Sequence, residues 1–315
     1  MDYVCLGSSG IRVSELCLGT MTFGKEADEA TSKVLMDRAL DAGINFFDTA
    51  NIYNEGRTEE IVGRWIGPHR DGLILASKVH FPTGDGVNDS GSGRRHILRE
   101  VEKSLQRLQT DWLDIVYLHH WDEHTPIEES LAALTTLVEQ GKVMYCGVSN
   151  FSAWQTMKAM AVSAANGFAP IACIQPMYNL VKRQAEVELL PLAASEGLGV
   201  CPYNPLAAGV LTGKYLRGEQ GRLHESDMYK ERYKDPSYAE TAARFVDYAQ
   251  ANGLSPAALA VAWVLRHPAV TSAIIGARNL DQLNDTLGCL DIPLDADRRS
   301  KVSALAPAPP LATDR

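Results

Sequence analysis

The chain has 315 residues, of which 45% are hydrophobic, and it carries a formal net charge of −9. This size allows one large domain or two smaller ones, and the lack of a Pro/Gly/Ser-rich linker in the middle favours a single domain over residues 1–315. No Lys/Arg cluster is long enough to form a basic face, so nucleic acid is not expected as a partner. Residues 307–315 form a Pro-rich tail that we expect to be poorly ordered.

The cysteines and the N-terminal residues indicate a compartment. Six cysteines occur without a C-x-x-C pair, and most lie inside apolar runs typical of strands, so we expect buried free thiols. The first residues lack the basic and apolar regions of a signal peptide, and no apolar run approaches the about 18 residues of a membrane span. We therefore predict a cytoplasmic protein that does not associate with a membrane.

Residues 3–14 alternate in polarity around Gly7-Ser8-Ser9-Gly10, which predicts a small β-hairpin ahead of the first strand. Periodic apolar residues predict helices over 31–42, over 94–108 and around 127–138. Apolar runs typical of strands occupy residues 16–20, 44–48, 73–78, 113–119, 143–148, 172–175, 199–203 and 271–276. The chain therefore alternates between strands and helices, as in a parallel sheet.

The spacing of the strands favours one fold. Most strand ends follow one another at about 30 residues, the length of a βαβ unit, but a longer interval separates residues 203 and 276. We predict a long loop at 207–236 in that interval, followed by helices near 237–251 and 256–267. Eight such units describe an α/β fold, a (β/α)8 TIM barrel. An open doubly wound sheet that binds a dinucleotide would carry G-x-G-x-x-G, which is absent.

The Gly/Ser-rich segment 84–93 has the composition of a phosphate-binding loop. It does not lead from a buried strand directly into a helix, as such a loop would. We therefore interpret it as a mobile loop.

Four polar residues stand at or just past the ends of three predicted strands: Asp48, Tyr53, Lys78 and His119. In parallel barrels the reactive residues gather at the carboxyl ends of the strands, so these four predict one shared site. A phenol, an ammonium, a carboxylate and an imidazole suit proton delivery to a carbonyl group. Taken singly, each also has a structural interpretation, such as a turn former, a surface aromatic or a solvated strand end.

Several motifs in order resemble the aldo-keto reductase family. They are Gly43-Ile44-Asn45-Phe46-Phe47-Asp48-Thr49-Ala50 with Tyr53 and Gly56, Leu118-His119, Gly147-Val148-Ser149-Asn150-Phe151, Tyr203-Asn204-Pro205-Leu206 and Ile274-Ile275-Gly276-Ala277-Arg278. The resemblance extends from the hairpin to about residue 290. It implies a (β/α)8 barrel that binds NADPH across its carboxyl face without a Rossmann motif.

The resemblance implies a role for each of the four residues. Tyr53 would donate the proton, and because a free phenol has a pKa near 10, the Lys78 ammonium should lower that pKa. Asp48 would keep Lys78 charged and in place, and a neutral His119 would orient the substrate oxygen. His120 follows directly, but adjacent side chains of a strand point to opposite faces, so only one histidine should face the site. The family pattern selects His119.

The resemblance also implies cofactor contacts, and no metal ion is expected. Near the ribose and pyrophosphate it places Gly19, Thr20 and Met21. Ser149, Asn150 and Gln175 would bind the carboxamide, with Tyr203 stacked on the nicotinamide ring. The pyrophosphate would be wrapped by Asn204, Leu206, Gly209 and Lys214, and the adenosine end would be held by Gly276, Arg278, Gln282 and Asp285. Asp48 would also lie beside the cofactor.

Cofactor choice depends on Arg278, which could bind a 2′-phosphate and so favours NADPH over NADH. Many family members have Lys-Ser where this chain has Gly276-Ala277, and arginine where it has Gln282, so NADH stays an alternative. For the substrate, Phe23, Phe81 and Trp121 are predicted to line an apolar pocket that suits small or aromatic carbonyl compounds.

We therefore predict NADPH-dependent reduction of aldehydes or ketones to alcohols. A second hypothesis is a cofactor-binding, redox-sensing regulatory subunit of the same fold. A third is an aldolase that uses Lys78 as a Schiff-base lysine, but this requires a deprotonated lysine, which a paired Asp48 opposes.

Overall fold

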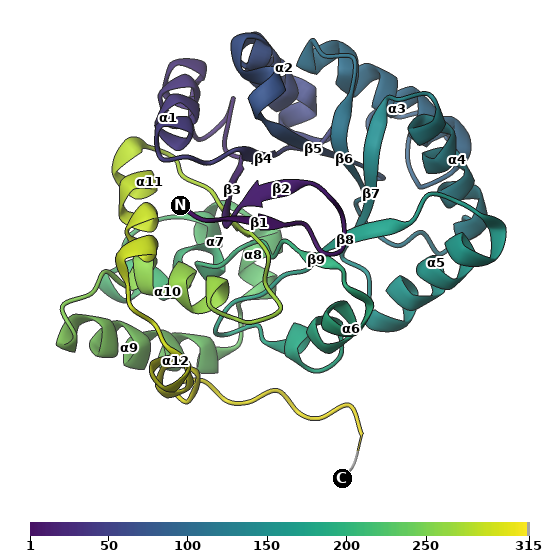
Figure 1. Ribbon diagram of the computed structural model, residues 1–315. Coiled ribbons are helices and arrows are strands. Elements are labelled where there is room, and N and C mark those ends of the chain that lie inside the picture. Colours follow the sequence, from purple (N-terminus) through teal and green to yellow (C-terminus); the bar gives the residue numbers. More distant parts are fainter. Residues whose placement is uncertain (314–315) are drawn as a thin grey trace.

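The computed structural model describes residues 1–313. Its centre is a sheet of eight parallel strands in the order β10-β3-β4-β5-β6-β7-β8-β9, surrounded by helices (Figure 1). The strands are β3 (Leu16–Gly19), β4 (Phe46–Asp48), β5 (Ile74–Val79), β6 (Leu113–Leu118), β7 (Val143–Ser149), β8 (Ile171–Gln175), β9 (Gly199–Val200) and β10 (Ala273–Ile275). Each predicted strand is present, with ends that shift by a few residues.

The two end strands of the sheet are joined by backbone hydrogen bonds. The amide of Thr271 donates to the carbonyl of Val200, and the amide of Ile274 donates to the carbonyl of Pro202, each at 2.9 Å. The sheet therefore curls back toward its first strand. This arrangement is consistent with the predicted (β/α)8 barrel.

The helices that follow the strands form the outer layer, with their apolar faces against the sheet. They are α1 (Glu29–Asp41), α2 (Arg57–Ile66), α3 (Arg94–Leu108), α4 (Ile127–Glu139), α5 (Ala153–Asn166), α6 (Leu189–Glu196), α9 (Pro236–Ala251), α10 (Pro256–Leu265), α11 (Leu280–Leu287) and α12 (Ala296–Ser303). Helix α3 has the predicted bounds, because its apolar residues recur at helical spacing over that range. Helix α5 begins at a capping box of Ser152 and Gln155 and ends at Gly167, whose φ is +66°.

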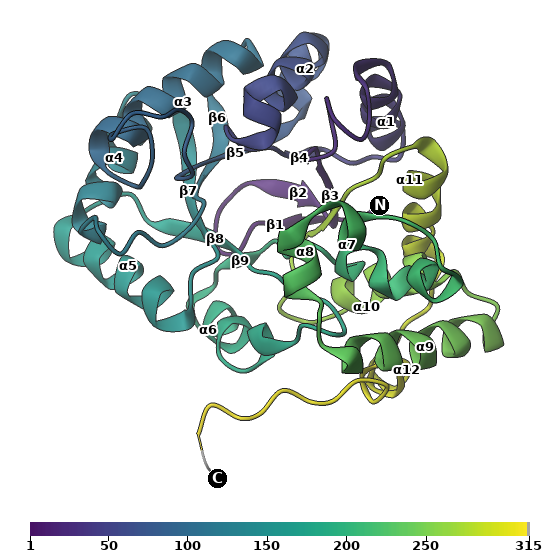
Figure 2. The same ribbon diagram turned by 180° about the vertical axis from the view of Figure 1, so that it is seen from behind.

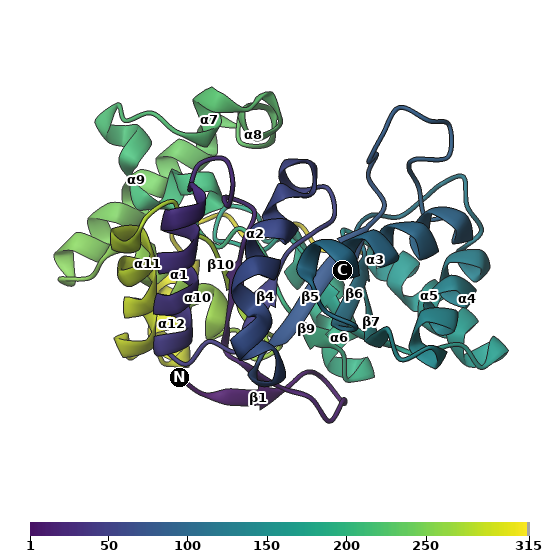
Figure 3. The same ribbon diagram turned by 90° about the horizontal axis from the view of Figure 1, so that it is seen from above.

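A hairpin covers the end of the sheet opposite α7 and α8 (Figure 3). Its strands β1 (Tyr3–Cys5) and β2 (Arg12–Ser14) pair antiparallel, with Tyr3 opposite Ser14. Leu6 and Val13 are fully buried among the residues inside the sheet. Gly7 lets the turn approach the sheet closely, because a Cβ there would lie 2.4 Å from the carbonyl oxygen of Gly197.

The segment after β9 differs from the prediction of a loop over 207–236. It forms short helical turns, including α7 (Arg222–Glu225) and α8 (Asp227–Arg232), which Figure 2 shows across the front of the sheet. Glycines end the first turns, since Gly213 and Gly218 both adopt positive φ. Leu211, Tyr229 and Tyr233 are buried, so tertiary packing holds turns that are too short to be stable alone.

Other expectations meet mixed outcomes. Residues 84–93 form a largely exposed loop without helix or strand, as predicted. Of the six free cysteines five are buried, but Cys5 is exposed because it lies in the hairpin outside the sheet. Residues 307–313 contain no helix or strand, and the last two residues of the predicted tail lie outside the described residues. Over residues 1–313, no helix has both the length and the apolar character needed to cross a membrane.

The contact between α2 and α3 generates a stability prediction. A Cβ on Gly63 would lie 2.2 Å from the carbonyl oxygen of Arg107, a backbone atom that cannot move without separating the helices. Overpacking costs up to about 3 kcal/mol, whereas alanine gains about 1 kcal/mol in helix propensity. We expect Gly63→Ala to lower the free energy of unfolding by about 2 kcal/mol, measured by urea denaturation.

Gly72→Ala is the matched control. A Cβ on Gly72 meets nothing within 4 Å, so this variant should stay within about 0.5 kcal/mol of the parent protein. Equal effects of the two substitutions would contradict the close approach of α2 to α3.

Candidate active site

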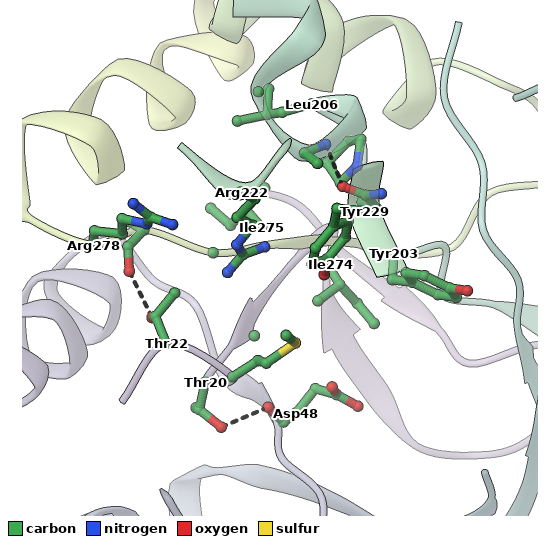
Figure 4. Close-up of a pocket in the computed structure, with 18 of the residues that line it drawn as sticks. Thr20, Thr22, Asp48, Tyr203, Leu206, Arg222, Tyr229, Ile274, Ile275 and Arg278 are labelled. Carbon is green, nitrogen blue, oxygen red and sulfur yellow. Dashed lines mark hydrogen bonds between the residues drawn. The ribbon is translucent and has the colours of Figure 1, made fainter. Parts of the chain in front are cut away.

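A cavity of about 620 Å³ opens at the carboxyl ends of the strands. Figure 4 shows part of its wall, with Thr20 and Asp48 on one side and Arg222, Tyr229 and Leu206 on the other. The residues predicted to bind the cofactor all line it: Gly19, Thr20, Met21, Asp48, Ser149, Asn150, Gln175, Tyr203, Asn204, Leu206, Gly209, Lys214, Gly276, Arg278, Gln282 and Asp285. The topology therefore brings residues from six strand ends and two following segments to one place.

The four predicted catalytic residues form one cluster at the inner end of this cavity. Asp48, Tyr53 and His119 line the wall, and Lys78 lies behind them with 1% of its surface exposed. Lys78 Nζ lies 2.6 Å from Asp48 Oδ2 and 3.1 Å from Tyr53 Oη. The rings of Tyr53 and His119 meet edge to face, with their centroids 6.1 Å apart.

Every donor of the Lys78 ammonium has a partner. Besides Asp48 and Tyr53, Nζ donates to the carbonyl oxygen of Thr49 at 2.7 Å, so all three N–H groups are used. The second carboxylate oxygen of Asp48 accepts from Gln175 Nε2 at 2.8 Å. The pairing of β4 with β5 sets this geometry, because Asp48 ends β4 opposite Ala76 and Lys78 follows two residues later on β5. A buried cation needs such complete pairing to offset its lost hydration.

A strained turn directs Tyr53 into the cavity. After Tyr53, three successive residues adopt the left-handed conformation: Asn54 (φ 49°), Glu55 (φ 59°) and Gly56 (φ 89°). Such backbone costs about 1 kcal/mol or more per non-glycine residue and persists only where surrounding contacts hold it. Here Asn54 Nδ2 donates to the carbonyl oxygens of Met21 at 3.1 Å and Phe23 at 2.8 Å. The turn is therefore tied to the segment that follows β3.

The charges in the cluster correct one expectation. Burial lowers the pKa of Lys78, but Asp48 and Tyr53 together raise it above its ordinary value, so the lysine stays protonated. Burial also raises the pKa of Tyr53, and this outweighs the lowering by Lys78. The prediction of a net lowered Tyr53 pKa is therefore wrong for the protein alone. A permanently protonated, fully paired Lys78 also opposes the Schiff-base hypothesis.

His119 is held neutral. Burial, the Lys78 ammonium and the neighbouring rings of His80 and His120 place its pKa well below the ordinary value. Its Nδ1 atom is buried without a hydrogen-bond partner among the described residues. Phe81 packs edge to face against the ring at 4.8 Å between centroids. Packing against Phe81 and Tyr53 therefore holds a neutral ring at the cavity wall.

The structure places both histidines at the cavity wall, which differs from the expectation that only one faces it. His120 lies two residues past the end of β6, so strand alternation no longer applies to the pair. His120 is exposed and its Nδ1 lies 2.8 Å from the carbonyl oxygen of Trp121, whereas His119 is buried beside Tyr53.

Two of the three predicted substrate residues lie elsewhere. Phe81 lines the cavity, but Phe23 is fully buried in the core, where the segment after β3 packs on α2. Trp121 turns away and packs edge to face against Phe151 and Trp154. Residue type alone could not separate these orientations, because all three aromatics follow strand ends.

Sequence reasoning missed wall residues of the segment after β9. Arg222, Met228, Tyr229 and Arg232 line the cavity, although only Gly209 and Lys214 of the predicted loop 207–236 were expected to reach the site. Arg222 and Arg232 lie over the Tyr229 ring at 5.4 and 5.5 Å. The concentration of basic and aromatic residues between 214 and 233 was the available signal.

Basic side chains dominate the end of the cavity away from Tyr53. Arg278 pairs with Glu225 at 2.7 Å and approaches Glu26 at 3.7 Å, and Arg222 also approaches Glu26 at 3.7 Å. Lys214 has no ion-pair partner in the described chain, and burial together with Arg278 lowers its pKa. This end of the cavity is therefore suited to phosphate groups, although the whole chain is acidic.

An eight-stranded parallel sheet with acid–base residues and a large cavity at its carboxyl end defines a class of α/β enzymes that act on small molecules. The model of the Aldo/keto reductase family matches residues 15–307. The chain is 41% identical to the "Uncharacterized oxidoreductase YrpG" of Bacillus subtilis (strain 168), over 98% of this chain and 97% of that protein. The chain belongs to the aldo/keto reductase family, and its relatives there support an oxidoreductase.

Two further relatives show the range of the similarity. The "Probable voltage-gated potassium channel subunit beta" of Oryza sativa subsp. japonica is 38% identical over the whole of this chain and 99% of its own length. "Protein tas" of Escherichia coli (strain K12) is 34% identical over 97% of each chain.

The surroundings of His119 predict the pH range in which its ring takes up a proton. Because its pKa is lowered, the ring should take up a proton only at a pH well below 6.5. We expect the ring nitrogens to keep the shifts of neutral imidazole between pH 8 and pH 5.5, measured by two-dimensional ¹H–¹⁵N NMR. His119→Asn identifies the signal by its loss. A protonation midpoint near or above the ordinary value would contradict the proximity of the Lys78 ammonium.

Proposed function

We propose that the protein catalyses the reversible reduction of aldehydes or ketones to alcohols with NADPH. The observation that carries the proposal is the Lys78 ammonium, which contacts both Asp48 and Tyr53 at the inner end of the cavity. When bound, NADPH supplies the hydride that the carbonyl carbon accepts. The protein must then supply the proton and stabilise the developing charge on oxygen.

Tyr53 is the proposed proton donor. Its raised pKa keeps the phenol protonated at neutral pH, and the phenol therefore holds the proton that the substrate oxygen needs. As the proton leaves, negative charge develops on Oη, 3.1 Å from the Lys78 ammonium. This attraction is stronger in the transition state than in the ground state, which is the requirement for catalysis. Asp48 positions Lys78, and neutral His119 orients the substrate oxygen.

The cavity residues fit the two ends of a nicotinamide dinucleotide. Ser149, Asn150 and Gln175 supply amide and hydroxyl groups for the carboxamide, and Tyr203 supplies an aromatic face. Tyr203 is held by a hydrogen bond from its Oη to Asn150 Oδ1 at 2.7 Å. Lys214 would bind the pyrophosphate, and Arg278 would meet the adenosine end.

The first test is NADPH oxidation with 4-nitrobenzaldehyde, followed at 340 nm. Removal of a general acid costs about 100- to 10,000-fold, so Tyr53→Phe should lower kcat/KM by that range while the NADPH Kd changes little. Tyr248→Phe is the control, because this tyrosine of α9 lies outside the cavity and should keep full activity. Equal activity of Tyr53→Phe and the parent protein would contradict the proton-donor role.

Arg278 generates a prediction on cofactor choice. Hydrogen bonds to charged groups correspond to about 10- to 100-fold in affinity, so Arg278→Gln should raise the NADPH Kd by that factor and the NADH Kd by much less. Glu225→Gln should lower the NADPH Kd, because Glu225 competes for the same guanidinium at 2.7 Å. Arg95→Gln, an exposed charge on α3, controls for the loss of one charge. Fluorescence titration with both cofactors measures these changes.

A regulatory subunit is the second candidate function, and the named plant channel subunits favour it. Two such relatives are 38% and 35% identical to this chain, from Oryza sativa subsp. japonica and Arabidopsis thaliana. Tight NADPH binding without turnover of any aldehyde, in the parent protein as in Tyr53→Phe, would support this function over the reductase.

A further inference from the structure

Arg232, the last residue of α8, lies on the cavity wall and is half-buried. No carboxylate lies within 4 Å of it in residues 1–313, and its side chain donates no hydrogen bond there. The Tyr229 ring lies 5.5 Å from the guanidinium, but a ring replaces only part of the hydration that a half-buried cation loses. The position therefore favours an anionic ligand from outside the chain.

The other basic side chains of the cavity differ from Arg232 in pairing or in place. Arg217 pairs with Glu219 at 2.7 Å, and Arg278 pairs with Glu225 at the same distance. Arg222 lies 3.7 Å from Glu26. Lys214 is unpaired as well, but it lies near the paired arginines, where the phosphates of the proposed cofactor would bind.

Contacts of the next residue place the end of α8 beside Tyr203, the residue proposed to stack on the nicotinamide ring. Tyr233 Oη accepts from Asn204 Nδ2 at 2.7 Å and from Asn179 Nδ2 at 3.2 Å. These contacts tie the end of α8 to Tyr203, the residue before Asn204. Burial raises the pKa of Tyr203 to about 12. Among the nearby charges, Arg232 opposes this increase most strongly. Arg232 therefore lies near Tyr203 on the cavity wall.

We propose that Arg232 binds a carboxylate on the carbonyl substrate, so that the enzyme prefers aldehydes or ketones that carry an anionic group. This inference rests on the proposed reductase function. A guanidinium presents two parallel N–H groups that match the two oxygens of a carboxylate. Phe81, which also lines the cavity, offers apolar surface to the carbon skeleton between carboxylate and carbonyl.

The test compares 4-carboxybenzaldehyde with its neutral methyl ester, methyl 4-formylbenzoate. We expect the parent protein to reduce the acid with the higher kcat/KM. Arg232→Gln should lower kcat/KM for the acid by about 10- to 100-fold, mainly through KM, and change that for the ester by less than about twofold. Arg232→Lys should retain part of the preference, because it keeps the charge but loses the two-pronged geometry.

Lys230→Gln removes one exposed charge from the same helix and should change neither substrate. The NADPH Kd distinguishes the substrate carboxylate from the cofactor phosphates as the anion that Arg232 binds. A larger NADPH Kd in Arg232→Gln with an unchanged preference for the acid would overturn the proposal. An equal loss of kcat/KM for acid and ester in Arg232→Gln would also overturn the proposal.

If the parent protein reduces neither aldehyde, that result contradicts the proposed reductase function and does not yet test Arg232. Arg232 is then tested by calorimetry of both aldehydes binding in the presence of NADP⁺, which does not depend on turnover. Tighter binding of the acid that is lost in Arg232→Gln would still support the anion site. Equal affinity of the parent protein for acid and ester would contradict the proposed anion site.

Discussion

The buried ion pair between Lys78 and Asp48 is the interaction on which the site depends. Its 2.6 Å contact lies inside the sheet, where an unpaired charge would be strongly unfavourable, so β4 and β5 must hold both side chains in register. The remaining donors of Lys78 reach Thr49 and Tyr53. One ammonium therefore fixes the position of the phenol and, together with burial, keeps His119 neutral.

The acidity of Tyr53 results from two opposing effects. Burial disfavours the phenolate, and Lys78 favours it, with burial stronger in the protein alone. A phenol that stays protonated at neutral pH and gains stabilisation only as it loses its proton is a suitable acid. The strained turn after Tyr53 contributes geometry rather than charge, since Asn54 fastens it to the segment after β3.

The cavity combines two electrostatic regions within an acidic protein. Paired arginines and Lys214 form one region, whereas the unpaired Arg232 stands near Tyr203. The pairing of Arg278 with Glu225 links α7 to the residues after β10, so an anion that binds there must compete with a carboxylate. The helical turns after β9 thus supply much of the charge that the strands do not carry.

The sequence by itself determined the order of strands and helices, the hairpin and the cluster of Asp48, Tyr53, Lys78 and His119, because periodicity and strand ends are local properties of the chain. It could not determine which way a side chain turns after a strand has ended. Phe23 and Trp121 pack inward, His120 joins His119 at the wall, and Arg232 reaches the cavity from a segment expected to be a loop. Only the tertiary structure decided these positions, because contacts between residues far apart in the chain set them.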